Sequence, residues 1–294
     1  MRKYCFLLIM LFTAKLIYGQ QYPWCQDSIP IILDMTSKYG GIDFDKISND
    51  RRLVAIIHRF GEGTHIDTSY QKRKKMAKAK GLLWGGYHMF TNKSSMEYQV
   101  NRIVQYMDIA DDDLVSLNFE DPGSGSSERP QFKISMDSVF KAIQFFYDKV
   151  HRYPVVYFGP CYIKDSIERA LKKYPEAKRI KCIQLLANCP LWFVENRIIL
   201  PKVLFSYIQI HYKIWENYTL WQFSEGKNCK PNATGTIRHC DCKISNPDVS
   251  KYCSKPPPIP ACCLYPSSGI WFDGTNISVY NGTINDIRKK WPSL

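Results

Sequence analysis

Apolar runs of strand length alternate with segments of helical periodicity over most of the chain. This alternation is typical of parallel strands joined by crossover helices. The runs that predict strands cover residues 30–33, 53–60, 82–90, 114–120, 154–158, 191–194, 207–211 and 219–223. Eight strands of this kind predict an α/β fold in which the sheet closes into a barrel.

Helical periodicity fills several of the intervals between these runs. Residues 135–152 carry apolar side chains at spacings of three and four, which predicts a helix with one face packed on the barrel. Residues 95–109 and 162–174 predict further helices, and residues 71–80 a strongly basic one. The Gly-Ser-rich stretch 123–127 follows a predicted strand directly, and loops in that position build the sites of such barrels.

The stretch 225–268 breaks this rhythm, because it holds six of the eleven cysteines and a run of three prolines. We expect a cysteine-rich insertion that is held by cross-links, within a barrel that spans residues 20–294. The sequence His-Cys-Asp-Cys at 239–242 could also be interpreted as a set of metal ligands. The missing CxxC pairs favour disulfides over zinc, so we predict no metal site.

The first 19 residues have a basic start, an apolar stretch and a small residue at Gly19, with Lys15 interrupting the apolar stretch. This layout predicts a secretory signal peptide at 1–19, and a short buried helix is the alternative. Removal would leave ten cysteines, an even number that suits full pairing in an oxidising compartment. We therefore expect a secreted protein, in the extracellular space or the endolysosomal lumen. Five glycosylation sequons agree with export, at Asn92, Asn217, Asn232, Asn276 and Asn281.

The composition excludes several classes of protein, since 45% hydrophobic and 23% charged residues do not suit a disordered chain, collagen or a coiled coil. No apolar run after the signal peptide is long enough to span a membrane. The formal charge of +13, which falls to +10 without Arg2, Lys3 and Lys15, favours anionic partners such as a bacterial surface. The basic run 71–80 is better interpreted as a solvated helix face than as a binding site. It contains no interleaved aromatics, so nucleic acid is not an expected partner.

Polar residues follow several of the predicted strands. Asp34 comes directly after the first apolar run, where an acid either caps a turn or takes part in catalysis. Asn118 and Glu120 lie two positions apart on the fourth strand, so their side chains share one side of it. Two residues of extended chain span about 6.6 Å, a distance from which two groups can act on one glycosidic bond.

Further candidates lie near the ends of other strands. Glu62 follows the second strand, and Tyr87 and His88 come near the end of the third. A lone histidine in such a place is often a hydrogen-bonded core residue instead. Trp192 and Trp221 lie inside apolar runs, where they could contact a sugar or simply fill the barrel.

Seven blocks of the sequence carry a family resemblance: ILDMTS at 32–37, EGTHID at 62–67, GLLWGGYHMF at 81–90, LNFE at 117–120, PVVYFG at 154–159, PLWF at 190–193 and LWQFS at 220–224. In this order they resemble the blocks of the family 25 glycoside hydrolases, the Chalaropsis-type lysozymes (N-acetylmuramidases). The segment 276–291 resembles the closing strand and helix of that family.

The resemblance implies an irregular TIM-like β/α barrel that hydrolyses β-1,4 bonds of peptidoglycan, or of a related amino-sugar polysaccharide, without a cofactor. Asp34 resembles the acid after the family's first strand. Glu120 resembles the general acid that protonates the leaving oxygen, a role that requires a raised pKa. Tyr87 and His88 would be walls of the site.

The sequence departs from the family pattern at two positions. The family's Asp-x-Glu appears here as Asn118-Phe119-Glu120, and the closing motif begins with Asn276 where the family has an aspartate. Another alignment would place Asp241 there. An amide offers only a dipole to a developing sugar cation, and loss of one preorganised group commonly costs about 10²–10³ in rate.

Three hypotheses follow for the function. The first is a secreted lysozyme-like hydrolase that uses Glu120 and Asp34, helped by Asp273 or Glu62. The second is a glycan-binding relative without chemistry, in which Tyr87, Trp192, Trp221 and Asn118 contact sugar. The third is a secreted interaction protein that uses the cysteine-rich insertion.

Overall fold

The computed structural model describes residues 26, 28–38, 42–120, 134–159, 162–195, 204, 208, 213–224 and 276–294. The expected signal peptide at 1–19 and the expected cysteine-rich insertion at 225–268 lie outside these residues, and both stay predictions. Asp241 and Asp273 lie outside them as well.

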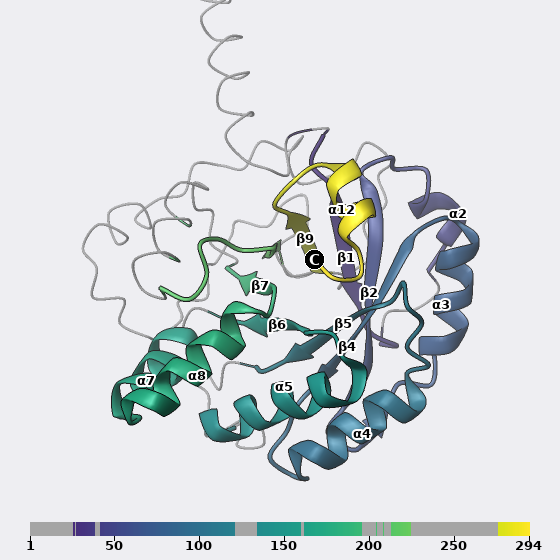
Figure 1. The fold of residues 1–294 in the computed structure, drawn as a ribbon. Coiled ribbons are helices and arrows are strands. Elements are labelled where there is room, and N and C mark those ends of the chain that lie inside the picture. Colours follow the sequence, from purple (N-terminus) through teal and green to yellow (C-terminus); the bar gives the residue numbers. More distant parts are fainter. Residues whose placement is uncertain are drawn as a thin grey trace, which may run out of the picture.

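Eight strands of the described chain form a closed ring, with helices around its outside (Figure 1). The order in the ring is β1, β9, β8, β7, β6, β5, β4 and β2, and β2 pairs again with β1. All neighbours are parallel except β9, which runs antiparallel to β1 and β8. The strands are β1 (Ile31–Met35), β2 (Leu53–Glu62), β4 (Leu83–Met89), β5 (Leu114–Asn118), β6 (Val155–Phe158), β7 (Leu191–Val194), β8 (Leu220–Ser224) and β9 (Asn276–Tyr280), and the short β3 (His65–Ile66) pairs with β2. The predicted TIM-like barrel is confirmed.

Seven of the eight strands predicted from apolar runs take part in the ring. The strand predicted at 207–211 lies outside the described residues, apart from Ile208, and in the described ring β9 occupies the place between β8 and β1. This strand was indicated only by the family resemblance. Its side chains suit both sides of the sheet, since Ile277 and Val279 pack toward the helices while Tyr280 packs inside the barrel.

The four helices predicted from periodicity are present, with small differences at their ends, whereas two further helices, at 44–47 and 176–187, were not predicted. The helices are α2 (Phe44–Ile47), α3 (Tyr70–Ala79), α4 (Met96–Tyr106), α5 (Met136–Val150), the π-helix η3 (Ile163–Glu168), α7 (Arg169–Lys173), α8 (Glu176–Ala187) and α12 (Ile284–Lys290). Serine side chains set two of the starts: Ser95 accepts from the Tyr98 amide before α4, and Ser135 from the Ser138 amide before α5. His151 ends α5 in the left-handed conformation.

Two buried layers hold the barrel together. The outer layer lies between sheet and helices and includes a stack of three rings from neighbouring strands, Phe90 on Phe119 and Phe119 on Phe158. The inner layer fills the barrel with side chains such as Ile32 and Ile57. Ile287 and Trp291, from α12 and just after it, belong to the inner layer too, so α12 closes one end of the barrel.

The cysteines of the described part do not follow the expected full pairing. Cys182 on α8 and Cys189 just after that helix are both free and buried. Their thiols are packed among apolar side chains, where a small hydrophobic residue fits without a bridge. For these two residues the prediction of full pairing is wrong.

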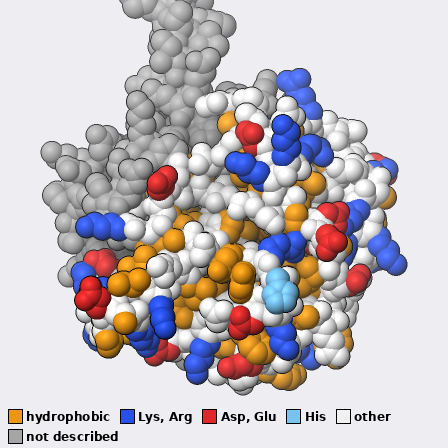
Figure 2. Space-filling view, viewed as in Figure 1, with side chains coloured by type: hydrophobic (Ala, Val, Ile, Leu, Met, Phe, Trp, Pro, Cys, Tyr) orange, Lys and Arg blue, Asp and Glu red, His pale blue; other side chains and the backbone are white. Residues whose placement is uncertain are grey.

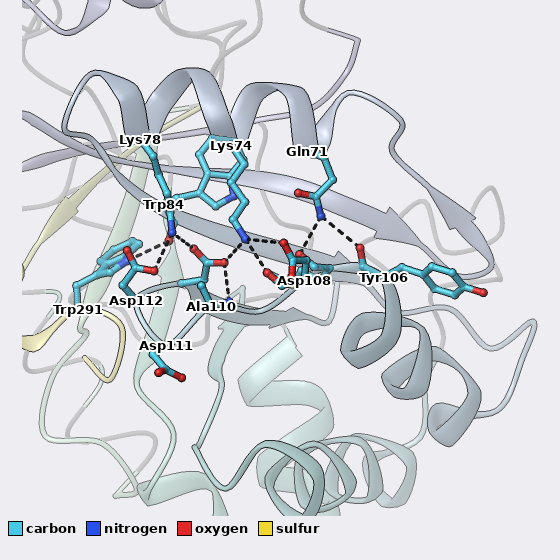
Figure 3. A network of polar contacts seen from close by, with 12 residues as sticks. Gln71, Lys74, Lys78, Trp84, Tyr106, Asp108, Ala110, Asp111, Asp112 and Trp291 are labelled. Atoms are coloured by element: carbon cyan, nitrogen blue, oxygen red, sulfur yellow. Dashed lines mark hydrogen bonds and ion pairs between the residues drawn. The ribbon is translucent and has the colours of Figure 1, made fainter.

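The basic helix α3 is held against an acidic loop that leads into β5. Lys74 lies 2.6 Å from Asp113, and Lys78 lies 2.8 Å from Asp113 and 2.7 Å from Asp112. Figure 3 shows both lysines pointing from α3 toward this loop. The interpretation of residues 71–80 as a solvated face therefore holds for Lys72, which is exposed, but is wrong for Lys74, which is buried.

The positive charge is spread over the surface. On the face drawn in Figure 2, Lys and Arg side chains lie around the periphery with acidic side chains among them. Among the described helices, none combines the length and the apolarity that crossing a bilayer requires.

Candidate active site

The candidate site lies at the end of the barrel opposite α12, where the parallel strands have their carboxyl ends. The antiparallel β9 begins at this end, because Asn276 pairs with Asp34 near the end of β1. The inner face of the sheet is identified by the residues that pack inside the barrel, and paired residues of neighbouring strands share a face. Most of the predicted site residues can be placed on this basis.

Asp34 lies beside Asn276 across the β1–β9 pair. The Asn276 Nδ2 donates to Asp34 Oδ1 at 2.9 Å, and Asp34 is only 3% exposed. A hydrogen bond to a carboxylate favours its ionised form. The Asn276 amide therefore gives Asp34 a hydrogen-bond donor without a second negative charge, which an aspartate at this position would add.

Asn118 and Glu120 come from the end of β5. Asn118 Oδ1 accepts from Ser116 Oγ at 2.7 Å inside the barrel, and Asn118 is buried. Phe119 points to the outer layer, so the alternation of the strand places Glu120 on the same side as Asn118. Glu120 is partly exposed, as a group that must reach a substrate requires.

An aromatic cluster supports the mouth from inside the barrel. Trp192 makes edge contacts with Tyr87 and Tyr157 at centroid distances of 6.3 and 5.0 Å, and its Nε1 donates to Ser278 Oγ at 3.0 Å. Trp192 is 0% exposed, so it fills the barrel beneath the two tyrosines and has no free face for a sugar. Tyr157 was not predicted as a site residue, although it lies in the block PVVYFG at 154–159 that carries the family resemblance.

Two predicted site residues lie apart from the mouth. His88 is buried in the outer layer, where its Nε2 lies 3.3 Å from Gln99 Oε1 and its ring contacts Phe60 and Phe90. Trp221 is fully buried in the same layer and donates to the Glu195 carbonyl. Both face the helices because they are next to inward-facing residues on their strands. The predictions that they line the site are corrected accordingly.

Glu62 lies at the rim of the mouth and is paired with a residue that the sequence analysis did not select. Arg59 Nη1 donates to Glu62 Oε2 at 3.1 Å. Arg59 pairs with Tyr87 in the β2–β4 register, which places its side chain on the inner face. The sequence does mark Arg59, as a charged residue in a mostly apolar strand, next to the polar residue His58.

A scan against models of protein families finds no match, and a search of curated protein sequences finds none either. Solved structures do match. A muramidase from Trichobolus zukalii is similar over 90% of this chain and 100% of its own, with 14% identity and a TM-score of 0.56. A family GH25 lysozyme from Aspergillus fumigatus (17% identity, TM-score 0.56, 89% and 98% covered) and a family 25 glycosyl hydrolase from Bacillus anthracis (13%, 0.56, 90% and 94%) are similar too.

The chain has the fold of the family 25 lysozymes. At these identities the likeness concerns the course of the backbone, and the chemistry depends on the side chains at the mouth. In this lysozyme fold, the described part places Asp34, Asn118 and Asn276 on inner faces at the carboxyl end of the barrel, with Glu120 two residues after Asn118. The described residues contain no cluster of His, Cys, Asp or Glu that could hold a metal ion.

One of the expected glycosylation sequons coincides with this site. Asn276 uses its amide nitrogen to bind Asp34, and the serine of its sequon, Ser278, is fully buried beside Trp192. A glycan on Asn276 would therefore require this part of the lysozyme fold to open. Asn92 and Asn281, by contrast, are exposed.

Two buried histidines make the stability of the lysozyme fold dependent on pH. Burial lowers the pKa of both His58 and His88 to about 4. The unfolded chain binds these protons near pH 6.5, so the stabilisation is complete above that pH and is lost as the pH falls toward 4. Between pH 7 and 5 we expect a loss of about 2 kcal/mol per histidine, measured by urea unfolding.

A single substitution separates this effect from the general effect of acid. His88→Gln should remove about half of the pH dependence, because one of the two protons is no longer taken up. His65→Gln, at an exposed histidine of β3, should leave it unchanged. An equal slope in all three proteins would show that other groups cause the acid sensitivity.

Proposed function

We propose that the chain is a lysozyme-like protein that binds peptidoglycan or a related amino-sugar polysaccharide at the mouth of its barrel and hydrolyses its β-1,4 bonds. The observation that supports this most is the arrangement of Asp34 and Asn276 opposite the end of β5, in a fold shared with muramidases. Glu120 follows directly on that strand and is accessible.

The chemistry requires one group that gives a proton and one that stabilises positive charge. Glu120 is the proposed acid, which protonates the oxygen of the leaving sugar. Asp34 is the proposed anion, which stabilises the developing cation on the ring that remains. Asn276 donates a hydrogen bond to Asp34, which favours the charged form of that carboxyl group. In this proposal Asp34 therefore acts as the anion, and Glu120 as the proton donor.

A second candidate function is binding without hydrolysis. The observation that favours it is that both family positions with a changed residue are amides engaged in hydrogen bonds, Asn118 with Ser116 and Asn276 with Asp34. Each amide is held as a fixed polar group, which suits recognition of sugar hydroxyl and acetamido groups as well as it suits catalysis. A third function, through the insertion at 225–268, would not depend on the mouth at all.

Purified peptidoglycan distinguishes these functions when binding and cleavage are measured on the same samples. The protein is incubated with the insoluble material, and both the fraction that sediments with it and the reducing ends released are recorded. Binding with release supports the hydrolase, and binding without release supports the second function. An interaction protein would show neither, and would lose its partner when residues 225–268 are deleted.

Asn118→Asp should raise the rate of hydrolysis by about tenfold or more. The substitution restores a carboxylate two positions before Glu120, which stabilises the developing cation and raises the pKa of the acid. An aspartate can accept the hydrogen bond from Ser116 without moving. Reducing-end release from peptidoglycan measures the effect. Asn101→Asp, on the exposed side of α4, is the matched control, and an unchanged rate in Asn118→Asp would contradict the assigned position.

We also propose that the protein is exported, since a protein that degrades cell walls meets its substrate outside the cell. It is supported by the predicted signal peptide and by exposed sequons at Asn92 and Asn281. The net positive charge would increase the rate of encounter with an anionic bacterial surface.

A further inference from the structure

The crossover between β6 and β7 carries a dense group of basic side chains. Its helices α7 and α8 lie on the outside of the barrel beside α5 (Figure 1). Residues 169–181, here called the basic segment, have a net charge of +5, which is more than a third of the formal charge of the whole chain. The single acidic residue is Glu176, and the basic residues are Arg169, Lys172, Lys173, Lys178, Arg179 and Lys181.

The first half of α8 lies clear of the protein interior. Every residue from 175 to 181 is exposed, although 176–181 are helical, and α7 has no buried residue either. The buried residues of α8, Cys182 and Leu186, come only after this half. The side chains of the basic segment are therefore accessible to a partner on several sides of the helix.

Two of the six cations have partners that hold the segment in place. Lys178 Nζ lies 2.7 Å from Asp137 Oδ1 in the first turn of α5, and the Tyr174 hydroxyl donates to the same oxygen at 2.7 Å. Lys172 Nζ lies 2.6 Å from Glu168 Oε1, one turn earlier in the chain. These contacts fasten the junction of α7 and α8 to α5, so the segment presents a defined surface.

Three of the other cations have no counterion within the described chain. Lys173, Arg179 and Lys181 are exposed, and none of them forms an ion pair there. The helix α3 differs in this respect, because two of its lysines face the acidic loop before β5. Cations held close together repel one another, and an anionic partner would relieve that repulsion.

The chemistry of the segment fits a flexible polymer that carries a phosphate in each repeat. Four of the six basic residues are lysines, which bind phosphates as point charges and require no fixed geometry. An anionic membrane fits less well, because a helix in a bilayer surface needs a broad apolar face, and Ile180 is the one large apolar side chain exposed in this segment. Nucleic acid would require aromatic rings for stacking, and the ring of Tyr174 is covered by Lys178 Nζ at 3.8 Å.

We propose that the basic segment is a second binding surface, separate from the mouth, for an anionic phosphodiester polymer attached to the bacterial wall. The choice of a wall polymer rests on the proposed function, but binding of the polymer requires no cleavage at the mouth. Such a surface would keep the protein on the wall while successive glycan bonds enter the mouth. Because the cations are exposed, the binding should weaken as the salt concentration rises.

A soluble polymer tests the surface without any glycan. Titration calorimetry with poly(glycerol phosphate) at low salt should show binding by the wild-type protein. The triple variant Lys173→Gln/Arg179→Gln/Lys181→Gln should bind about 10- to 100-fold more weakly, since each basic side chain near an anionic surface contributes separately. These residues are exposed and glutamine is a good helix former, so the variant should fold as the wild-type protein does.

A matched variant controls for the net charge. Lys72→Gln/Lys75→Gln/Lys289→Gln removes three charges from exposed positions on α3 and α12, and it should bind the polymer nearly as tightly as the wild-type protein. Equal losses in the two triple variants would overturn the inference, because net charge and not the basic segment would then determine binding. Absence of binding by the wild-type protein would overturn it as well.

Vesicles separate the polymer from a lipid surface. Vesicles of phosphatidylglycerol and phosphatidylcholine in equal parts present phosphates on a bilayer and not on a chain. The wild-type protein should bind the polymer in preference to these vesicles. Binding to the vesicles but not to poly(glycerol phosphate) would assign the segment to a membrane and overturn the inference.

Bacterial walls connect this surface to the proposed function. Cold hydrofluoric acid removes phosphodiester-linked polymers and leaves the glycan, so walls are compared before and after this treatment. The wild-type protein should sediment more with untreated walls, whereas the triple variant of the basic segment should not distinguish them. Hydrolysis of treated walls without any preference for untreated ones would overturn this inference and leave the proposed function standing. Polymer binding without glycan binding or release would reject the proposed function and leave the surface assigned.

Discussion

Glu120→Gln is expected to reduce the release of reducing ends from peptidoglycan by at least about 100-fold. General acid catalysis by a positioned side chain contributes about 10²–10⁴ in rate, and glutamine has no proton of suitable acidity to give. The shape and most hydrogen-bonding capacity of the side chain are kept, so sedimentation with peptidoglycan should stay within about twofold of the wild-type value. The two measurements together separate a lost proton donor from a lost binding site.

A matched glutamate elsewhere on the surface controls for this change. Glu97 is exposed in the first turn of α4, and Glu97→Gln removes the same charge without reaching the mouth. It should release reducing ends at the wild-type rate. If Glu120→Gln were as active as Glu97→Gln, the proton would come from another group, and the role assigned to Glu120 would be wrong.

The strands of this fold could be predicted from the sequence because a barrel buries both faces of each strand. Such strands are continuous apolar runs, and seven of them took their predicted places. Because both faces of such a strand are apolar, the sequence does not show which of its side chains point into the barrel. Trp192 and Trp221 are both tryptophans in apolar runs, yet one fills the barrel and the other packs against the helices.

The candidate site was predictable where it depends on spacing within one strand. Asn118 and Glu120 share a side because they are two residues apart, and alternation alone establishes this. The contact between Asp34 and Asn276 joins residues 242 positions apart, and only the register of β9 against β1 brings them together. The motif resemblance could align Asn276, but it could not indicate that its amide binds Asp34.

Two charge patterns in the sequence gave wrong or missing predictions for a related reason. The basic run 71–80 suggested a solvated surface because its counterions lie in a different segment, the acidic loop before β5. Arg59 was not predicted as a site residue, because the role of a charged residue inside an apolar strand depends on which groups surround it in space. In both cases the prediction needed the spatial arrangement of separate segments, which their order along the sequence does not give.

The acidic loop gives the second large effect. Asp113→Asn is expected to lower the free energy of unfolding by about 3–5 kcal/mol, because it leaves the buried Lys74 without its closest counterion. Asp113 is 0% exposed, and its Oδ2, which pairs with Lys74, also accepts from the Ala110 amide at 3.1 Å, so the same oxygen shapes the turn. Urea unfolding at pH 7 measures the loss.

The neighbouring Asp112 provides the matched control, since it contacts Lys78, which also pairs with Asp113, from the solvent side. Asp112 lies 2.7 Å from Lys78 but is 69% exposed, and Asp112→Asn should cost less than about 1 kcal/mol. Equal losses in the two variants would mean that burial does not determine the strength of this network. Because Asp113 comes directly before β5, whose other end carries Asn118 and leads to Glu120, a loosened start of the strand should also displace the proposed acid. The Asp113→Asn protein should therefore lose hydrolytic activity at urea concentrations at which the Asp112→Asn protein is still fully active.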